Sequence, residues 1–209
     1  MINRKLLVIP AIIFLFAQSV TGQTLQELFE NGKKAFYSDQ FDSANILFSQ
    51  ILSRESNDYE VCFYKGLVYE VNFDNDKAIT ELTCAITMKP KSSEAYLKRA
   101  SIYDKQLKFT EAINDYTGAI KYDKKNTDAY FYRASDYQEL KQFNEAIKDY
   151  SRVIKLNPSE DIAFYNRGLL YKELKNSDKA INDFETAIRI DKIWEHELRP
   201  KIDSLKTGQ

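Results

Sequence analysis

The chain of 209 residues has few of the side chains on which most catalytic and metal sites depend. It contains one histidine, His196, and two cysteines, Cys62 and Cys84. Zinc sites and hydrolytic triads need histidine or a cysteine cluster at ligand spacing, so neither kind of site is expected. Only six glycines occur, and they form no phosphate-binding loop. We therefore expect a protein that is not an enzyme and that holds no metal or cofactor.

Charge and hydropathy argue against two further classes of partner. The chain has 30 basic and 31 acidic residues, a formal net charge of −1, and no run of basic residues. Such a surface lacks the electrostatic footprint of a nucleic-acid-binding protein and the polybasic patch that attracts anionic lipids. No second long apolar segment follows the first 22 residues. We expect no nucleic acid, and no membrane once those residues are removed.

The first 22 residues differ from the rest of the chain. Arg4 and Lys5 precede an apolar run from Leu6 to Ala17, and small or polar residues follow as far as Gly22. This order is typical of a secretory signal peptide, and the run is shorter than the roughly 20 residues that a spanning helix needs. Residues 1–22 are therefore predicted to be cleaved, which makes the protein exported, periplasmic or secreted, in a bacterial cell envelope. An uncleaved N-terminal membrane anchor is the alternative.

From Leu25 onward one pattern returns every 34 residues, five times without insertion or deletion. Numbered from its first residue, each repeat has Gly or Ala at position 8, Ala at position 20 and a large apolar residue at position 24. Positions 4, 8 and 11 make one stripe of a helix, and positions 17, 20, 24 and 27 make a second. The pattern predicts two antiparallel helices per repeat, with a break near position 15. The repeats are 25–58, 59–92, 93–126, 127–160 and 161–194.

This pattern resembles the tetratricopeptide repeat family. The family's aromatic residue at position 4, Tyr at 11, aromatic residue at 24, Ala at 27 and Pro at 32 are visible, with departures at Ala35, Cys62, Lys124 and Lys192. The resemblance implies an all-α fold, a right-handed α-solenoid of helix-turn-helix repeats over residues 23–194. Residues 195–209 are expected to form a C-terminal cap or tail, in which Pro200 limits the helix. Trp194 and Leu198 are expected to cover the last helix pair.

A further stripe at positions 2, 5, 9 and 12 is apolar or aromatic at its centre. In proteins similar to this one, that stripe lines the concave groove where peptides lie. Acidic residues at positions 2 and 12, Asp104 and Asp128 among them, favour a segment with apolar anchors and some basic residues. The alternative is that position 5 is buried between successive repeats. The predicted peptide-binding residues are Phe29, Phe63, Tyr64, Phe131, Tyr132 and Tyr165.

The resulting hypothesis is a scaffold for protein–protein interaction, which binds a protein or peptide segment in its concave groove in the cell envelope. A structural assembly factor of an envelope complex is the alternative, acting through self-association or through its convex and end surfaces. Position 5 is apolar throughout and position 2 never carries Lys. The carboxylate clamp of some family members, which holds a partner's C-terminus, is therefore not expected.

Two pairings across the helix hairpin are also predicted. Position 7 is basic and position 23 acidic in the last four repeats, which predicts a ladder of ion pairs. Cys62 and Cys84 occupy positions 4 and 26 of one repeat, one helical turn further along the same seam. Export would favour a disulfide between them. Alternatively, Cys62 is a small core residue and Cys84 is a separate thiol.

Overall fold

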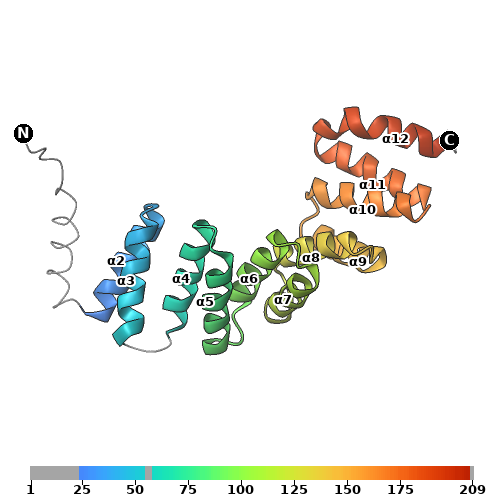
Figure 1. Cartoon of the computed structure of the whole chain (residues 1–209). Coiled ribbons are helices and arrows are strands. Elements are labelled where there is room, and N and C mark those ends of the chain that lie inside the picture. Colours follow the sequence, from blue (N-terminus) through green and yellow to red (C-terminus); the bar gives the residue numbers. More distant parts are fainter. Residues whose placement is uncertain (1–23, 55–57, 208–209) are drawn as a thin grey trace, which may run out of the picture. The chain divides into compact units, whose positions relative to one another are not determined.

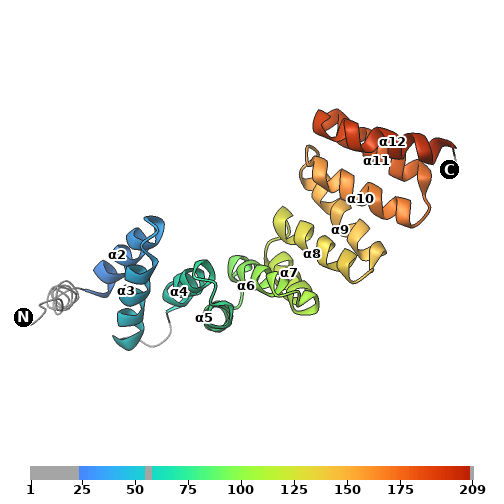
Figure 2. The same ribbon diagram turned by 45° about the horizontal axis from the view of Figure 1, so that its top comes forward.

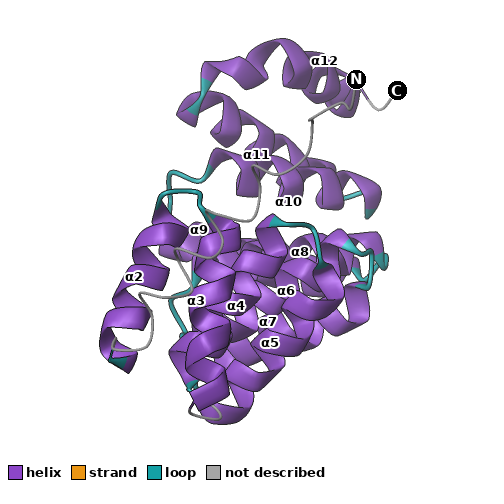
Figure 3. Ribbon diagram, turned by 60° about the vertical axis from the view of Figure 1, so that its left-hand side comes forward, coloured by secondary structure: helices purple, strands orange, loops and turns teal. Residues whose placement is uncertain are grey.

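The computed structural model describes residues 24–54 and 58–207, so the predicted signal peptide lies outside the described residues. Within those ranges the chain forms eleven α-helices and one short 3-10 helix, and Figure 3 shows helices and loops only. The predicted all-α fold is thereby confirmed. The helices of the five pairs are α2 (Leu25–Tyr37) with α3 (Phe41–Arg54), α4 (Tyr59–Val71) with α5 (Asn75–Met88), α6 (Ser93–Lys105) with α7 (Phe109–Tyr122), α8 (Thr127–Glu139) with α9 (Phe143–Leu156), and α10 (Asp161–Glu173) with α11 (Ser177–Ile190).

These helices fall into two compact units, each of which has its own core (Figures 1 and 2). The first unit ends at Met88 and holds α2 to α5. The second begins at Lys89 and holds α6 to α11, followed by the 3-10 helix η1 (Lys192–Trp194) and α12 (Glu195–Thr207). In both units the helices of a pair run antiparallel and are joined by a short turn.

Side-chain caps mark where the first helix of a repeat begins. The Asp58 carboxylate accepts hydrogen bonds from the backbone N–H groups of Glu60 and Val61, at 2.8 and 3.2 Å. Ser92 and Asn126 cap α6 and α8 in the same way. Such caps satisfy N–H groups that have no partner inside the helix. The residue directly before each of these repeats is therefore the N-cap of the repeat's first helix.

A left-handed residue ends that helix at position 15, where the sequence predicts the break. All five residues at this position have φ between 58° and 60°. This conformation lets the next N–H bond back to the carbonyl of position 11, at 2.7 to 2.9 Å, as in a Schellman turn. The second helix then starts directly. The residues are Asp39, Phe73, Leu107, Lys141 and Lys175.

The two helices of a hairpin approach closely at positions 8 and 24. A Cβ atom added to Gly32 would lie 2.6 Å from the Phe48 ring, and one added to Gly168 would lie 2.6 Å from the Phe184 ring. Both rings are fully buried. Small residues at position 8 are thus required because the large residue at position 24 packs directly on the backbone.

The predicted ion-pair ladder is confirmed and is largely buried. Arg133 donates two hydrogen bonds to Asp149, at 2.7 and 2.8 Å, and Arg167 pairs with Asp183 in the same forked geometry. Arg99–Asp115 and Lys65–Glu81 complete the set at 2.7 and 2.8 Å. Removing one partner of such a pair would leave a buried charge uncompensated, so the pairs fix the geometry of the hairpin.

Helix α12 covers the end of the last repeat. Its Leu198 and Ile202 are buried against α11. The expectation that Pro200 limits the helix is wrong, because α12 continues through Pro200 to Thr207. Packing on both sides of the proline offsets the one backbone hydrogen bond that it removes. In the described part of the chain, no helix is long and apolar enough to cross a membrane.

Phe73 offers a test of the turn geometry. Its side chain is 89% exposed while its backbone is left-handed at φ 60°, so it carries strain and contributes almost no packing. We expect Phe73→Asn to raise the free energy of unfolding by about 0.5–1 kcal/mol, measured by urea denaturation, because Asn tolerates this conformation. Phe73→Ala keeps the strain and should give no gain. An equal gain from both variants would mean that backbone strain is not the cause.

Candidate functional site

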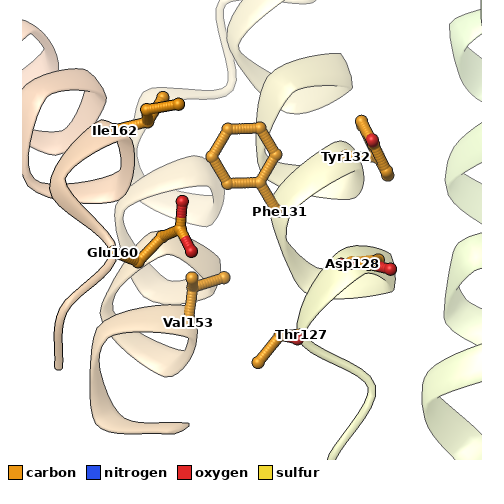
Figure 4. A pocket seen from close by; sticks show the side chains of 7 residues that line it. All are labelled: Thr127, Asp128, Phe131, Tyr132, Val153, Glu160 and Ile162. Atoms are coloured by element: carbon orange, nitrogen blue, oxygen red, sulfur yellow. The ribbon is translucent and has the colours of Figure 1, made fainter. Parts of the chain in front are cut away.

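A hollow of about 210 Å³ lies between α8, α9 and α10 in the second unit. Figure 4 shows Phe131 at its centre, projecting from α8 toward Ile162 on α10. Val153 of α9 closes the apolar side. The volume exceeds the roughly 150 Å³ of an engineered cavity that binds benzene, so the hollow is large enough for one apolar side chain.

Acidic groups stand at the edge of this apolar surface. Asp128, in the first turn of α8, is exposed, and Glu160 lies directly before α10. Asn157 donates a hydrogen bond to Glu160 at 3.0 Å, which orients its carboxylate. An apolar floor with carboxylates at its edge favours a ligand that combines an apolar side chain with positive charge.

Phe131 and Tyr132 lie on this site, as two of the six residues predicted for the groove. Phe131 is held by an edge-to-face contact with the buried Tyr150 ring, at 5.5 Å between centroids. Tyr132 is 46% exposed and points to the other side of α8, where it stacks on Tyr116 at 6.0 Å. These contacts fix both rings before any ligand arrives.

Three other predicted groove residues take part in packing within the first unit. Phe29 and Tyr64 contact each other at 5.9 Å between ring centroids and belong to the core around Phe48. Phe63 is only 6% exposed and stacks on Tyr59. The contact of Phe29 with Tyr64 agrees with the alternative in which position 5 packs between successive repeats. Burial by the neighbouring repeat could not be read from the period alone.

The sixth predicted residue, Tyr165, is covered by the C-terminal segment. Its ring stacks on Trp194 at 4.4 Å between centroids, and its hydroxyl donates to Glu197 at 2.8 Å. Burial and the Glu197 carboxylate raise the pKa of Tyr165 to about 12. Trp194 is anchored in turn by a hydrogen bond from its indole N–H to Asp161, at 2.5 Å.

Sequence models of known families match three stretches of the second unit. The tetratricopeptide repeat matches residues 93–126 and 162–192, and a further model described as TPR repeat matches residues 134–175. Residues 93–126 and 134–192 therefore consist of tetratricopeptide repeats (TPRs). A search of the curated proteins found no match.

Solved structures show the same fold. A crystal structure of MamA protein is 24% identical, has a TM-score of 0.76, and aligns over 82% of this chain and 94% of its own. MamA from Desulfovibrio magneticus RS-1 is 14% identical, with a TM-score of 0.74 over 83% and 98% of the two chains. YrrB, described as a TPR protein with an unusual peptide-binding site, is 18% identical, with a TM-score of 0.74 over 85% and 92%. At these identities the likeness is one of fold.

The TPR pattern does not predict the acidic pair beside Tyr132, of which Asp136 is buried. Asp136 of α8 is 1% exposed, and the Asp104 carboxyl of α6 is its hydrogen-bonding neighbour. Burial, followed by the proximity of Asp104, raises the pKa of Asp136 to about 8. Asp136 is therefore protonated at neutral pH, whereas an ordinary Asp is ionised. The signal available in the sequence was that the second, third and fifth repeats carry Val68, Ile102 and Leu170 at the same position.

The two cysteines also meet within the first unit. Cys62 on α4 and Cys84 on α5 have their Cα atoms 5.9 Å apart, with the two sulfur atoms in bonding contact. This separation lies at the most common value for disulfides. A disulfide here would close a loop across the second hairpin of the TPR protein.

Intact mass tests the disulfide. We expect the protein purified without reductant, unfolded and alkylated, to take up no label, and the reduced protein to take up one label on each cysteine. Reduction should also lower the free energy of unfolding by about 3 kcal/mol, because the bond restricts the conformational entropy of the unfolded chain by about that amount for a loop of this length. Full labelling of both cysteines without reductant would exclude the bond.

The pH dependence of stability tests the buried state of Asp136. Its pKa is raised from about 4 in the unfolded chain to about 8 in the folded protein. The folded state therefore binds the extra proton, and the contribution of Asp136 to stability declines as pH rises from about 4 to about 8. The groups that face it are Asp104 of α6, Tyr116 of α7, Glu139 of α8 and Tyr150 of α9.

Asp136→Leu should remove this slope. We expect it to raise the free energy of unfolding at neutral pH by about 1–3 kcal/mol, because it replaces a buried group that lacks a full set of hydrogen bonds. The gain, measured by thermal unfolding from pH 5 to 8.5, should grow with pH. A gain that is equal at every pH, or a loss, would contradict the assignment.

Proposed function

We propose that this TPR protein is a scaffold that binds an extended protein or peptide segment through the hollow between α8, α9 and α10. The observation that carries the proposal is the fixed Phe131 ring in a hollow with Asp128 and Glu160 at its edge. An apolar anchor in a preformed pocket, surrounded by polar groups, is the usual arrangement at the centre of a binding surface. TPR proteins as a class bind protein or peptide partners, which agrees with this proposal.

Preorganisation supports a binding role over a purely structural one. Phe131 packs on Tyr150, and Tyr150 is buried in the core of its own hairpin. Val153 is buried in that same core. The hollow therefore keeps its shape without a ligand, and little conformational entropy is lost when an apolar side chain enters.

We further propose that the protein acts after export to the cell envelope. The N-terminal pattern of Arg4, Lys5 and a short apolar run supports this, as does the facing pair of cysteines, because disulfides persist in oxidising compartments. Mass spectrometry of the N-terminus of protein recovered from its native host tests it. A mature chain that starts near Gln23 is expected, and a chain that keeps residues 1–22 would support the anchor.

Selection of short random peptides against the purified protein tests the binding function. We expect enrichment of sequences with one large apolar residue and neighbouring Lys or Arg. Ile162→Asp should weaken the selected peptides by about tenfold or more in fluorescence anisotropy, because it places a charge on the apolar wall. Ile162 is 43% exposed, so folding should be retained.

Leu174→Asp is the matched control for that substitution. Leu174 lies at the other end of the same helix and has the same exposure, but it lies outside the hollow. We expect it to leave affinity unchanged. The proposal fails if no peptide is enriched, or if both variants bind equally well. Oligomers of the wild-type chain that bind no peptide would favour the assembly factor instead.

A further inference from the structure

Position 10 of the repeat is the place where this chain breaks its own packing rule. Val68, Ile102 and Leu170 hold this position in three repeats as buried apolar residues, and the first repeat has the exposed Lys34. In the fourth repeat the residue is Asp136, and it is equally buried. An acid in a position where neighbouring repeats use aliphatic residues costs stability, so folding alone gives no reason for it.

The buried acid is also incompletely bonded. Within the described chain, Asp136 Oδ2 is buried and makes no hydrogen bond, and the same holds for the Tyr116 hydroxyl. Both atoms belong to one cluster, because the carboxyl groups of Asp104 and Asp136 have the largest electrostatic effects on the Tyr116 hydroxyl. In the next hairpin Tyr150 occupies the equivalent position, and its hydroxyl is hydrogen-bonded to Ser135 and Asn166. Two of the unpaired buried atoms of the described chain thus belong to the cluster of Asp104 and Asp136.

This cluster lies next to the hollow, on the other side of α8. Tyr132 contributes to the rim of the hollow, but its ring lies on the side of α8 away from Ile162, and Asp136 follows it by four residues on that side. Tyr116 stacks on Tyr132 and so links the two places from α7. Asp104 is half-buried and belongs to position 12, on the stripe that also carries Asp128 at position 2. A segment that anchors in the hollow would therefore cross α8 beside Tyr132 to reach Asp104.

We propose that Asp104 and Asp136 form the receiving site for a lysine or arginine side chain of the bound segment. This inference rests on the proposed function and adds the chemistry of a second contact. The cation meets the Asp104 carboxylate at the surface end of the pair. Its charge stabilises the ionised form of Asp136, which gives up its proton to solvent, and the donors on the cation supply hydrogen bonds that the free site lacks.

The geometry also sets the spacing of the ligand. Phe131 and Asp136 are five residues apart on α8, about 8 Å along the helix axis and about 140° apart around it. An extended chain covers roughly 3.3 Å per residue. The path between the two contacts is longer than the axial rise, so the basic residue should lie at least about three positions from the apolar anchor.

Synthetic peptides with one leucine anchor test this inference directly. One set carries lysine three to five positions before or after the leucine, and the reference set carries glutamine at the same places. We expect wild-type protein to bind the best lysine peptide about tenfold more tightly than its glutamine counterpart, by fluorescence anisotropy at low salt. The preference should increase as pH rises toward 8, because Asp136 must release its proton.

Three variants separate a binding role from a structural one. Asp136→Leu and Asp104→Asn should abolish the preference for lysine while the glutamine peptide binds as before. Glu111→Gln removes a charge from an exposed position on α7, away from the acidic pair, and should keep the preference. Asp136→Leu should at the same time be more stable than wild type, since Leu170 occupies the equivalent position.

The outcomes distinguish this inference from the proposed function. One outcome would overturn the acidic site and still support binding in the hollow. In that outcome Ile162→Asp binds neither peptide set, and the preference for lysine survives in Asp136→Leu and Asp104→Asn. Absence of lysine preference in the wild type would also overturn the acidic site. Failure of every peptide to bind wild-type protein would overturn both.

Discussion

The close approach of the two helices in each hairpin is the constraint on which the rest of the structure depends. At Gly32 and Gly168 there is no room for a Cβ atom against the opposing phenylalanine ring. Once position 8 meets position 24, position 7 must face position 23, and position 4 must face position 26. The first correspondence produces the forked pairs such as Arg133–Asp149, and the second brings Cys62 and Cys84 together. One steric contact thus determines both electrostatic and covalent chemistry along the seam.

The arginine forks extend this order from one hairpin to the next. Besides Asp149, Arg133 reaches Thr117 of the preceding hairpin at 2.8 Å, and Arg167 reaches Ser151 at 2.8 Å. A lysine has no planar fork with which to hold its own hairpin and a neighbouring one at the same time. The relative positions of α7, α8, α9 and α10 are therefore fixed within the second unit. The hollow at Phe131 depends on this, since its walls come from three different helices.

Much of the fold could be predicted from the sequence because the determinants are local and repeated. The period, the break at position 15, the ion pairs and the facing cysteines each follow from spacing along two helices. The fate of position 5 could not be predicted in the same way, because it is decided by neighbours of different size. Phe29 packs with Tyr64 in the first unit, whereas Trp194, the last residue of the fifth repeat, covers Tyr165. Phe131 has no such cover among its described neighbours, and it lines a hollow instead.

The acidic pair of Asp104 and Asp136 could not be predicted from the sequence for a related reason. A repeat pattern states what a position requires on average, and an exception such as Asp136 has meaning only once its burial is known. Val, Ile and Leu at the same position show that the fold is served by an aliphatic side chain there. A buried carboxyl that lowers stability has a physical reason where the binding of a ligand offsets the loss. Asp136 lies one helical turn from Tyr132, a residue at the rim of the hollow. If the proposed site is right, stability and binding make opposite demands on this one residue.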